Sequence, residues 1–176
     1  MHISGFTFLI EKDGLINQVS IGGQIQKISD LYQWRNEIRI VEVGLFKDYP
    51  YLIVSYGTHP CSYVFINSDH IYGGEKAWDI PVDCHGGVTL TQPANVFIPD
   101  IVNKMSNPYV EYGSFFSIIE QDSFVIGWDY AHGDDFYLER KHWGTKVWTL
   151  AELRCECQDV IEQLDFIMNP QQRIYV

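Results

Sequence analysis

The feature that most constrains the fold is one amphipathic pattern near the C-terminal end of the sequence. Thr149, followed three residues later by Glu152, has the sequence of a capping box, which begins a helix. Apolar side chains then recur every three or four residues, a spacing that aligns them on one helix face. This apolar stripe comprises Leu150, Leu153, Cys157, Val160, Ile161, Leu164 and Met168. Because Asn169-Pro170 ends the pattern, we predict a helix over 149–168 whose stripe packs into the core.

The residues before this helix favour β-structure. Runs rich in β-branched and aromatic residues predict strands at 6–10, 15–21, 38–46, 51–56, 62–66, 88–91, 115–119 and 123–128. Asp13-Gly14 is typical of a hairpin turn between the first two strands, and Gln121-Asp122 is expected to join the last two. The proline-rich stretch 93–109 is expected to be a loop. Strands followed by one long helix indicate an α+β fold, a mainly antiparallel sheet with the C-terminal helix packed across it.

The composition predicts a single domain that spans residues 1–176. Hydrophobic residues make up 46% of the chain, and a chain of this length can bury about 70% of its extended surface on folding. Aromatic residues make up 15% and charged residues only 20%, which is the opposite of the composition of a disordered chain. We therefore expect a sizeable core that needs no disulfide or metal to hold it together.

The charge balance limits the partners of the chain. Lys and Arg number 12 and Asp and Glu 23, a net charge of −11, which excludes general nucleic-acid binding because that needs a basic surface. A small anionic ligand in a local pocket stays compatible with this charge. The sequence contains no run of about 18 apolar residues, so no membrane span is expected. The N-terminal residues lack the basic stretch of a signal peptide. The cysteines lack C-x-x-C spacing and are expected to be reduced thiols in the cytoplasm: Cys61, Cys84, Cys155 and Cys157.

Side chains with chemical potential gather in two short segments that flank predicted strands. Residues 83–87 read Asp-Cys-His-Gly-Gly, and residues 127–135 read Gly-Trp-Asp-Tyr-Ala-His-Gly-Asp-Asp. Glycine in such places lets the backbone adopt a positive φ or approach a ligand closely. Loops at strand ends carry binding residues in many folds. We predict that the two segments meet at one end of the sheet and line one pocket.

The residue types in these segments support four interpretations. Asp129, His132 and Asp135 are spaced by three residues and, with His85, offer the ligands of a divalent metal. Without a metal, Asp129 could orient a histidine, with His85 and His132 as general acid and base. In a binding site the two histidines would donate hydrogen bonds to a phosphate. In a purely structural role the aspartates would cap turns and His132 would pack over the loop.

A ligand pocket also needs faces on which a base can stack, and Trp78, Trp128 and Tyr130 are the expected ones. His59 precedes Pro60, which favours an extended backbone, and a pocket role for His59 competes with a turn role. The expected ligand-binding set comprises His59, Trp78, Asp83, His85, Gly86, Gly87, Trp128, Asp129, Tyr130, His132 and Asp135. The remaining histidines stand in polar or terminal stretches and are expected at the surface: His2, His70 and His142.

Several common sites are missing from the sequence. It contains no G-x-x-x-x-G-K-[ST], G-x-G-x-x-G, H-E-x-x-H or G-x-S-x-G motif. ATP-driven chemistry, Rossmann-type oxidoreduction and serine hydrolysis are therefore disfavoured.

The order of the polar blocks resembles a widespread family of small phage and prophage proteins. That family carries HGG-[LI]-T and G-F-D-x-A-H-x-G-D blocks, and the resemblance covers about residues 31–165. The matching residues here are Trp34, Glu37, His59-Pro60, Asp83, His85 to Thr89, Gly127 to Asp135, Glu156 and Gln163-Leu164. Trp128 stands where the family has Phe and Asp134 where it has Gly, while Asp135 keeps the acidic position.

The resemblance implies a non-structural phage accessory protein in the cytoplasm of an infected or lysogenic bacterial host. By analogy with other small phage proteins we expect an anti-defence role, in which the chain binds and sequesters a small nucleotide-derived immune signal. The alternative is a metal-dependent phosphodiesterase or hydrolase that cleaves a cyclic nucleotide signal. A third class is a protein that masks a host protein through its acidic surface. The sequence fixes no cofactor; a divalent metal and a homo-oligomer are both compatible with it.

Overall fold

The computed structural model describes residues 2–3, 6–10, 16–21, 24–27, 39–56, 59–105, 108–133, 135, 146 and 148–170. Side chains are described from residue 39 onward, apart from those of 108–111. Six residues named above lie outside the described residues, as does the side chain of His2: Asp13, Gly14, Trp34, Glu37, Asp134 and His142.

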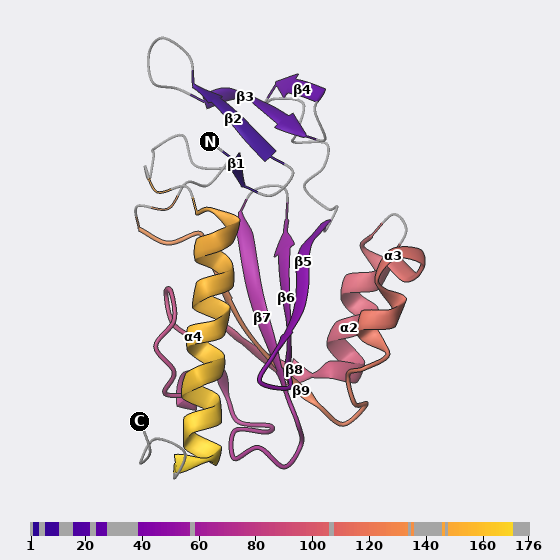
Figure 1. Cartoon of the computed structure of the whole chain (residues 1–176), viewed down its shortest axis with the longest axis vertical. Helices are drawn as coiled ribbons and strands as arrows, with labels where there is room; N and C mark the ends of the chain where they lie inside the picture. The colour runs from indigo at the N-terminus through magenta and orange to yellow at the C-terminus, as the bar shows by residue number, and fades with distance from the viewer. Residues whose placement is uncertain are drawn as a thin grey trace.

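The central element is a five-stranded antiparallel sheet with the strand order β5-β6-β7-β9-β8. Its strands are β5 (Arg39–Phe46), β6 (Tyr49–Ser55), β7 (Pro60–Ile66), β8 (Leu90–Pro93) and β9 (Phe124–Asp129). The helix α4 (Leu150–Met168) runs along one face of the sheet, and α2 and α3 lie on the other side (Figure 1). The predicted α+β fold, with a mainly antiparallel sheet and a C-terminal helix across it, is confirmed.

The start of the chain forms a second antiparallel sheet. Its strands are β1 (His2–Ile3), β2 (Phe6–Ile10), β3 (Ile16–Ile21) and β4 (Gln24–Lys27), paired in chain order. The β2 and β3 strands pair from Phe6 opposite Ile21 to Ile10 opposite Ile16, with one irregularity at Leu9 and Ile10. The predicted N-terminal hairpin is confirmed.

The helix α4 has the predicted capping box and the predicted buried stripe. The Thr149 hydroxyl accepts a hydrogen bond from the Glu152 backbone, and the Glu152 carboxylate accepts one from the Thr149 backbone. The stripe packs on the β6, β7 and β9 side chains that point to this face. Its fully buried members are Leu153, Cys157, Val160, Ile161 and Leu164.

The prediction of a loop over 93–109 is wrong, because α2 (Ala94–Asn103) and the start of α3 (Pro108–Phe116) occupy this stretch. Pro93 caps α2 and Pro108 begins α3, positions where the missing proline N–H costs no helical hydrogen bond. Only Pro99 lies inside a helix, and apolar residues three or four positions apart face the sheet around it. No described helix has both the length and the apolar character needed to cross a membrane.

The predicted strand at 115–119 is also wrong. Phe115 and Phe116 end α3, and both pack with Ile119 into the core between α3 and the sheet. The β9 strand, which was expected to pair with this segment, lies instead between β7 and β8. Aromatic residues are common in strands and in buried helix faces alike, so the short run alone could not distinguish the two.

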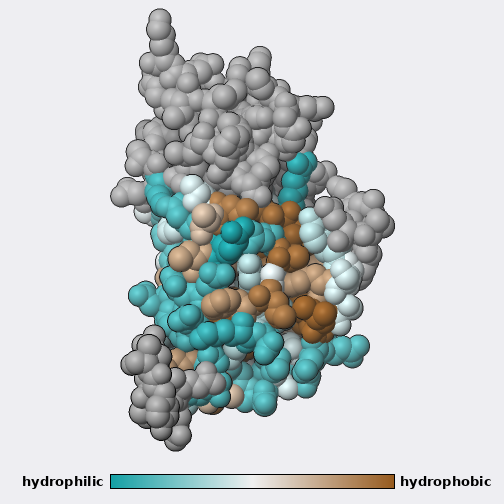
Figure 2. Space-filling view, in the orientation of Figure 1, coloured by the Kyte–Doolittle hydropathy of each residue, from teal (hydrophilic) through white to brown (hydrophobic). Residues whose placement is uncertain are grey.

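Apolar side chains also reach the surface. Figure 2 shows them gathered between α4 and α2, near β5, which is an edge strand of the described five-stranded sheet. Leu45 on β5 is 56% exposed.

Candidate functional site

The two polar segments meet where β9 ends and α4 begins. His85 Nε2, from the first segment, lies 2.5 Å from Asp135 Oδ2, at the end of the second. The rings of His85 and His132 are 5.7 Å apart between centroids. The prediction that the two segments come together at one end of the sheet is confirmed, whereas a pocket shared by both stays a prediction.

Asp135 is the centre of this arrangement and is only 6% exposed. Its Oδ1 accepts a hydrogen bond from Trp148 Nε1 (2.8 Å), and its Oδ2 accepts one from the His132 backbone N–H (2.9 Å). Burial raises the pKa of Asp135, but the hydrogen bonds from Trp148, the His132 backbone and His85 outweigh it and hold the pKa below its usual value. The carboxylate is therefore ionised at neutral pH.

Aromatic rings fix the orientation of His85. Its imidazole stacks on Tyr130 with a centroid distance of 5.2 Å and an angle of 6°. Trp148 meets the same imidazole edge-on at 4.9 Å. The His85 side chain remains 26% exposed, so its orientation is restricted while one side stays open to solvent.

Two polar residues of α4 hold the first segment in place. Glu156 accepts hydrogen bonds from the His85 backbone N–H (2.5 Å) and, through its other oxygen, from the Tyr130 hydroxyl (2.6 Å). Gln163 lies two helical turns further on, where its amide bonds both the backbone N–H and the carbonyl of Asp83 (2.7 and 2.9 Å). Glu156 and Trp148 were not among the predicted site residues. The sequence does place Glu156 seven residues before Gln163, which puts these two polar side chains on the same side of the predicted helix.

Gly86 is required by the geometry around His132. Its φ is +69°, and a Cβ added at this position would lie 2.5 Å from the His132 imidazole. Gly87 also has a positive φ, +80°, but a Cβ there would meet no atom within 4 Å. The first glycine therefore makes room for the histidine, and the second serves only the turn.

His132 and Asp129 form a second pair. His132 Nδ1 is buried and makes no hydrogen bond within the described residues, although Asp129 Oδ1 lies 3.5 Å away. Asp129 Oδ1 also accepts a hydrogen bond from the Ala131 backbone (3.1 Å), which is an Asx-type turn. The turn-capping interpretation of Asp129 and Asp135 is thus correct in geometry and does not exclude a role in a site.

Three side chains of the site could hold one metal ion. His85, His132 and Asp135 each offer a ligand atom, and these atoms lie within 4.8 Å of one another. The buried, unbonded Nδ1 of His132 marks a polar group whose partner is missing, which fits a ligand-binding cluster. Asp129, the fourth predicted ligand, lies outside this set of three and is paired with one of its members, His132.

The expected stacking faces are corrected by the structure. Trp128 is 1% exposed and Tyr130 is fully buried, because alternation along β9 turns Trp128 toward α4 and the chain then carries Tyr130 into the same core. Trp78 is 78% exposed, and its ring lies beside Lys76. None of the three offers a base a face at the His85–His132 cluster.

His59 and Asp129 line a shallow pocket of about 410 Å³ on the other face of the sheet. His59 stacks on Tyr56 there, with centroids 6.0 Å apart and an angle of 15°. The structure therefore separates His59 from His85 but connects both regions through Asp129.

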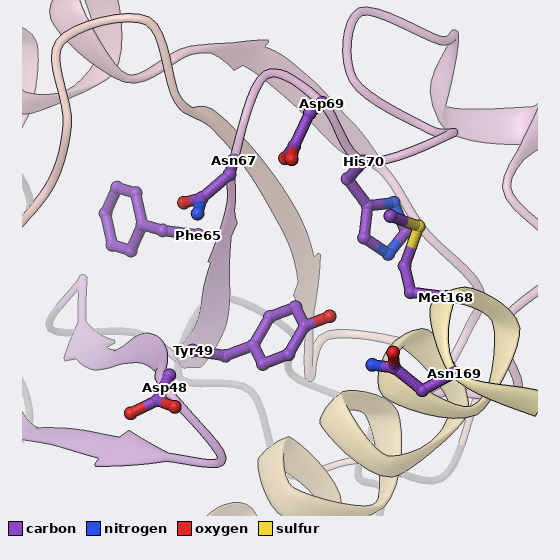
Figure 3. Close-up of a pocket in the computed structure, with 8 residues that line it drawn as sticks. All are labelled: Asp48, Tyr49, Phe65, Asn67, Asp69, His70, Met168 and Asn169. Carbon is purple, nitrogen blue, oxygen red and sulfur yellow. The ribbon is translucent and has the colours of Figure 1, made fainter. Parts of the chain in front are cut away.

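A smaller pocket of about 210 Å³ lies at the far end of α4 (Figure 3). His70, which was expected at the surface, lines it and is only 5% exposed. Its Nδ1 accepts the Tyr72 backbone N–H (3.2 Å), and Nε2 faces the Leu164 carbonyl (3.4 Å) at the end of the helix. Burial lowers the pKa of His70, so a neutral, structural histidine explains it.

No protein-family model, curated protein or solved structure matches this chain. The resemblance to phage proteins therefore stays a prediction, and function is inferred from the geometry of the site.

We predict that Gly86→Ala and Gly87→Ala have different effects on the site. Both place a side chain at positive φ, which costs about 1–2 kcal/mol of stability. Only Gly86→Ala also displaces the His132 ring. Imidazole signals in NMR spectra should shift for His132 in the first variant and stay in place in the second. Equal shifts in both would show that His132 is not packed against Gly86.

The low pKa of Asp135 predicts a pH-dependent stability. A carboxyl whose folded pKa is below its unfolded value of about 3.9 stabilises the fold above that value, and the contribution is lost as pH falls through the folded pKa. Denaturant unfolding should show Asp135→Asn less stable than the wild type above about pH 5, with the difference shrinking below about pH 4. Asp100→Asn, at an exposed aspartate paired with Lys104, is the control and should change stability little at any pH. A constant difference for Asp135→Asn would contradict the assignment.

Proposed function

We propose that this protein is a metal-dependent hydrolase of a phosphodiester, with His85, His132 and Asp135 as the metal ligands. The observation that carries the proposal is the convergence of these three ligand atoms within 4.8 Å. Two imidazoles and one carboxylate form a ligand set that suits zinc, manganese or iron(II) and leaves coordination positions open.

The surroundings of the three ligands suit this role. Asp135 is held ionised by its hydrogen bonds, and His85 is fixed by stacking on Tyr130. Asp129 Oδ1 lies 3.5 Å from the His132 ring, where a carboxylate helps to orient a ligating imidazole. A hydrogen lies between His85 Nε2 and Asp135 Oδ2 in the absence of metal, so the two atoms could ligate one ion only after this hydrogen has left that position.

A bound divalent cation supplies Lewis acidity and a water with a lowered pKa, which is the nucleophile that phosphodiester hydrolysis needs. In that reaction the water oxygen bonds to phosphorus, the bond to the leaving oxygen breaks, and the leaving oxygen takes up a proton. A bound cation would also give the site a local positive charge, which favours an anionic substrate on a chain whose net charge is −11. A nucleotide-derived signal is the substrate class we propose, on the strength of the resemblance to phage proteins.

Sequestration of the same signal without cleavage is the second candidate. The pocket beside Asp129 favours it, because a ligand could bind there without contacting the metal ligands. The buried positions of Trp128 and Tyr130 count against binding by base stacking at the cluster itself.

The first test is calorimetric titration of EDTA-treated protein with Zn²⁺ and Mn²⁺. We expect one equivalent to bind, and His85→Ala or His132→Ala to weaken binding at least tenfold, since each removes one ligand. His59→Ala is the matched control, because this histidine lies on the other face of the sheet, and it should leave metal affinity unchanged. The metal-loaded protein is then incubated with cyclic mononucleotides and dinucleotides, and the products are separated by chromatography.

The outcomes separate the two functions. Turnover beyond one equivalent supports the hydrolase, and its loss in His132→Ala assigns it to this site. Stoichiometric binding with the nucleotide recovered intact supports sequestration and overturns hydrolysis. Unchanged metal affinity in both histidine variants would overturn the metal site.

A further inference from the structure

The pocket on the far side of the cluster is connected to it through one residue. Side chains alternate along β9, so Trp128 faces α4 whereas Gly127 and Asp129 face the side of α2 and α3. Asp129 opposes Cys61 in the strand register, and Cys61 belongs to the core on that side. Asp129 therefore lines the pocket, and its Oδ1 also lies 3.5 Å from Nδ1 of His132 in the metal cluster.

The walls of this pocket are aromatic. Tyr56 and His59 are stacked nearly parallel, and the Tyr56 hydroxyl is hydrogen-bonded to that of Tyr63 (2.9 Å). Tyr63 lies flat against β9 because residue 127 is glycine; a Cβ there would lie 2.5 Å from the tyrosine ring. Tyr63 is only 4% exposed and packs against Phe97, so the half-buried Tyr56–His59 stack is the planar surface that the pocket offers a flat ring system.

Asp129 supplies acceptor oxygens to the lining of the pocket. The Asp129 side chain is 28% exposed, and its nearest contact at Oδ2 is a long one to the Thr89 hydroxyl (3.4 Å). Within the described residues, Oδ1 accepts a hydrogen bond from the Ala131 backbone N–H alone. A carboxylate has about four lone-pair sites, so both oxygens keep the capacity to accept further donors.

We propose that this pocket binds a guanine base, and that guanine is the base of the nucleotide handled by the metal cluster. Guanine presents two adjacent N–H donors, N1–H and the 2-amino group, which match the two oxygens of one carboxylate. Adenine and cytosine each place a ring acceptor beside their amino group, and uracil flanks its single N–H with carbonyls. The pocket volume of about 410 Å³ falls within the usual range for small-molecule sites. This assignment rests on the proposed function, because Asp129 serves both the base and His132.

The test uses nucleosides, which lack phosphate and do not depend on the metal. EDTA-treated protein is titrated separately with guanosine, adenosine, cytidine and uridine. We expect guanosine to bind at least tenfold more tightly than the other three. Asp129→Asn should abolish this preference, because its amide nitrogen opposes a donor, while its oxygen still caps the Ala131 turn. His59→Ala should weaken guanosine at least fivefold through loss of the stacked wall.

Two results would overturn the assignment: equal affinity for all four nucleosides, including no binding of any, or a guanosine preference that survives in Asp129→Asn. Asp122→Asn, at an exposed residue before the start of β9 and so at the opposite end of that strand from Asp129, is the control and should leave guanosine affinity unchanged. If the protein binds no metal but still prefers guanosine, the hydrolase proposal is overturned and the guanine pocket is supported. If the protein binds metal and turns over a nucleotide but shows no preference for guanosine, the hydrolase is supported and the guanine pocket is overturned.

Discussion

The site depends on one carboxylate that joins three segments of the chain. Glu156, on α4, accepts the His85 backbone N–H with one oxygen and the Tyr130 hydroxyl with the other. The Tyr130 hydroxyl is also bonded by Trp128 Nε1 (2.9 Å) and lies 3.2 Å from the Ser62 hydroxyl, so the network extends into the sheet. Glu156 thus ties the first polar segment to the end of β9, and Gln163, further along α4, holds the same segment at Asp83.

The end of β9 divides the chemistry of the molecule between two faces. On the α4 face, His85, His132 and Asp135 form the candidate metal cluster beside a buried aromatic core. On the other face, Asp129 contributes acceptors to an aromatic pocket. The two sites lie on different faces because side chains alternate along β9. They are connected because the turn after Asp129 brings His132 back beside the Asp129 carboxylate. A substrate bound on one side could therefore be held within reach of the other.

The sequence predicted α4 and the meeting of the two polar segments because both depend on local signals. A capping box and an apolar stripe specify a helix, and glycine beside strand ends specifies a tight loop. It missed α2 and α3 because proline at a helix start resembles proline in a loop. It also missed Trp148, whose indole reaches Asp135 only through tertiary packing, and it gave Trp128 a ligand-facing role that strand alternation denies.

The central claim is that two histidines and one carboxylate hold a metal. X-ray absorption at the zinc edge of the zinc-loaded protein tests it most directly, since the spectrum counts imidazole, oxygen and sulfur neighbours. We expect two imidazole nitrogens at about 2.0–2.1 Å with oxygen in the remaining positions, and one imidazole in His132→Ala. Cys84 lies next to His85 in the chain, and a sulfur neighbour at about 2.3 Å, or an unchanged spectrum in His132→Ala, would contradict it.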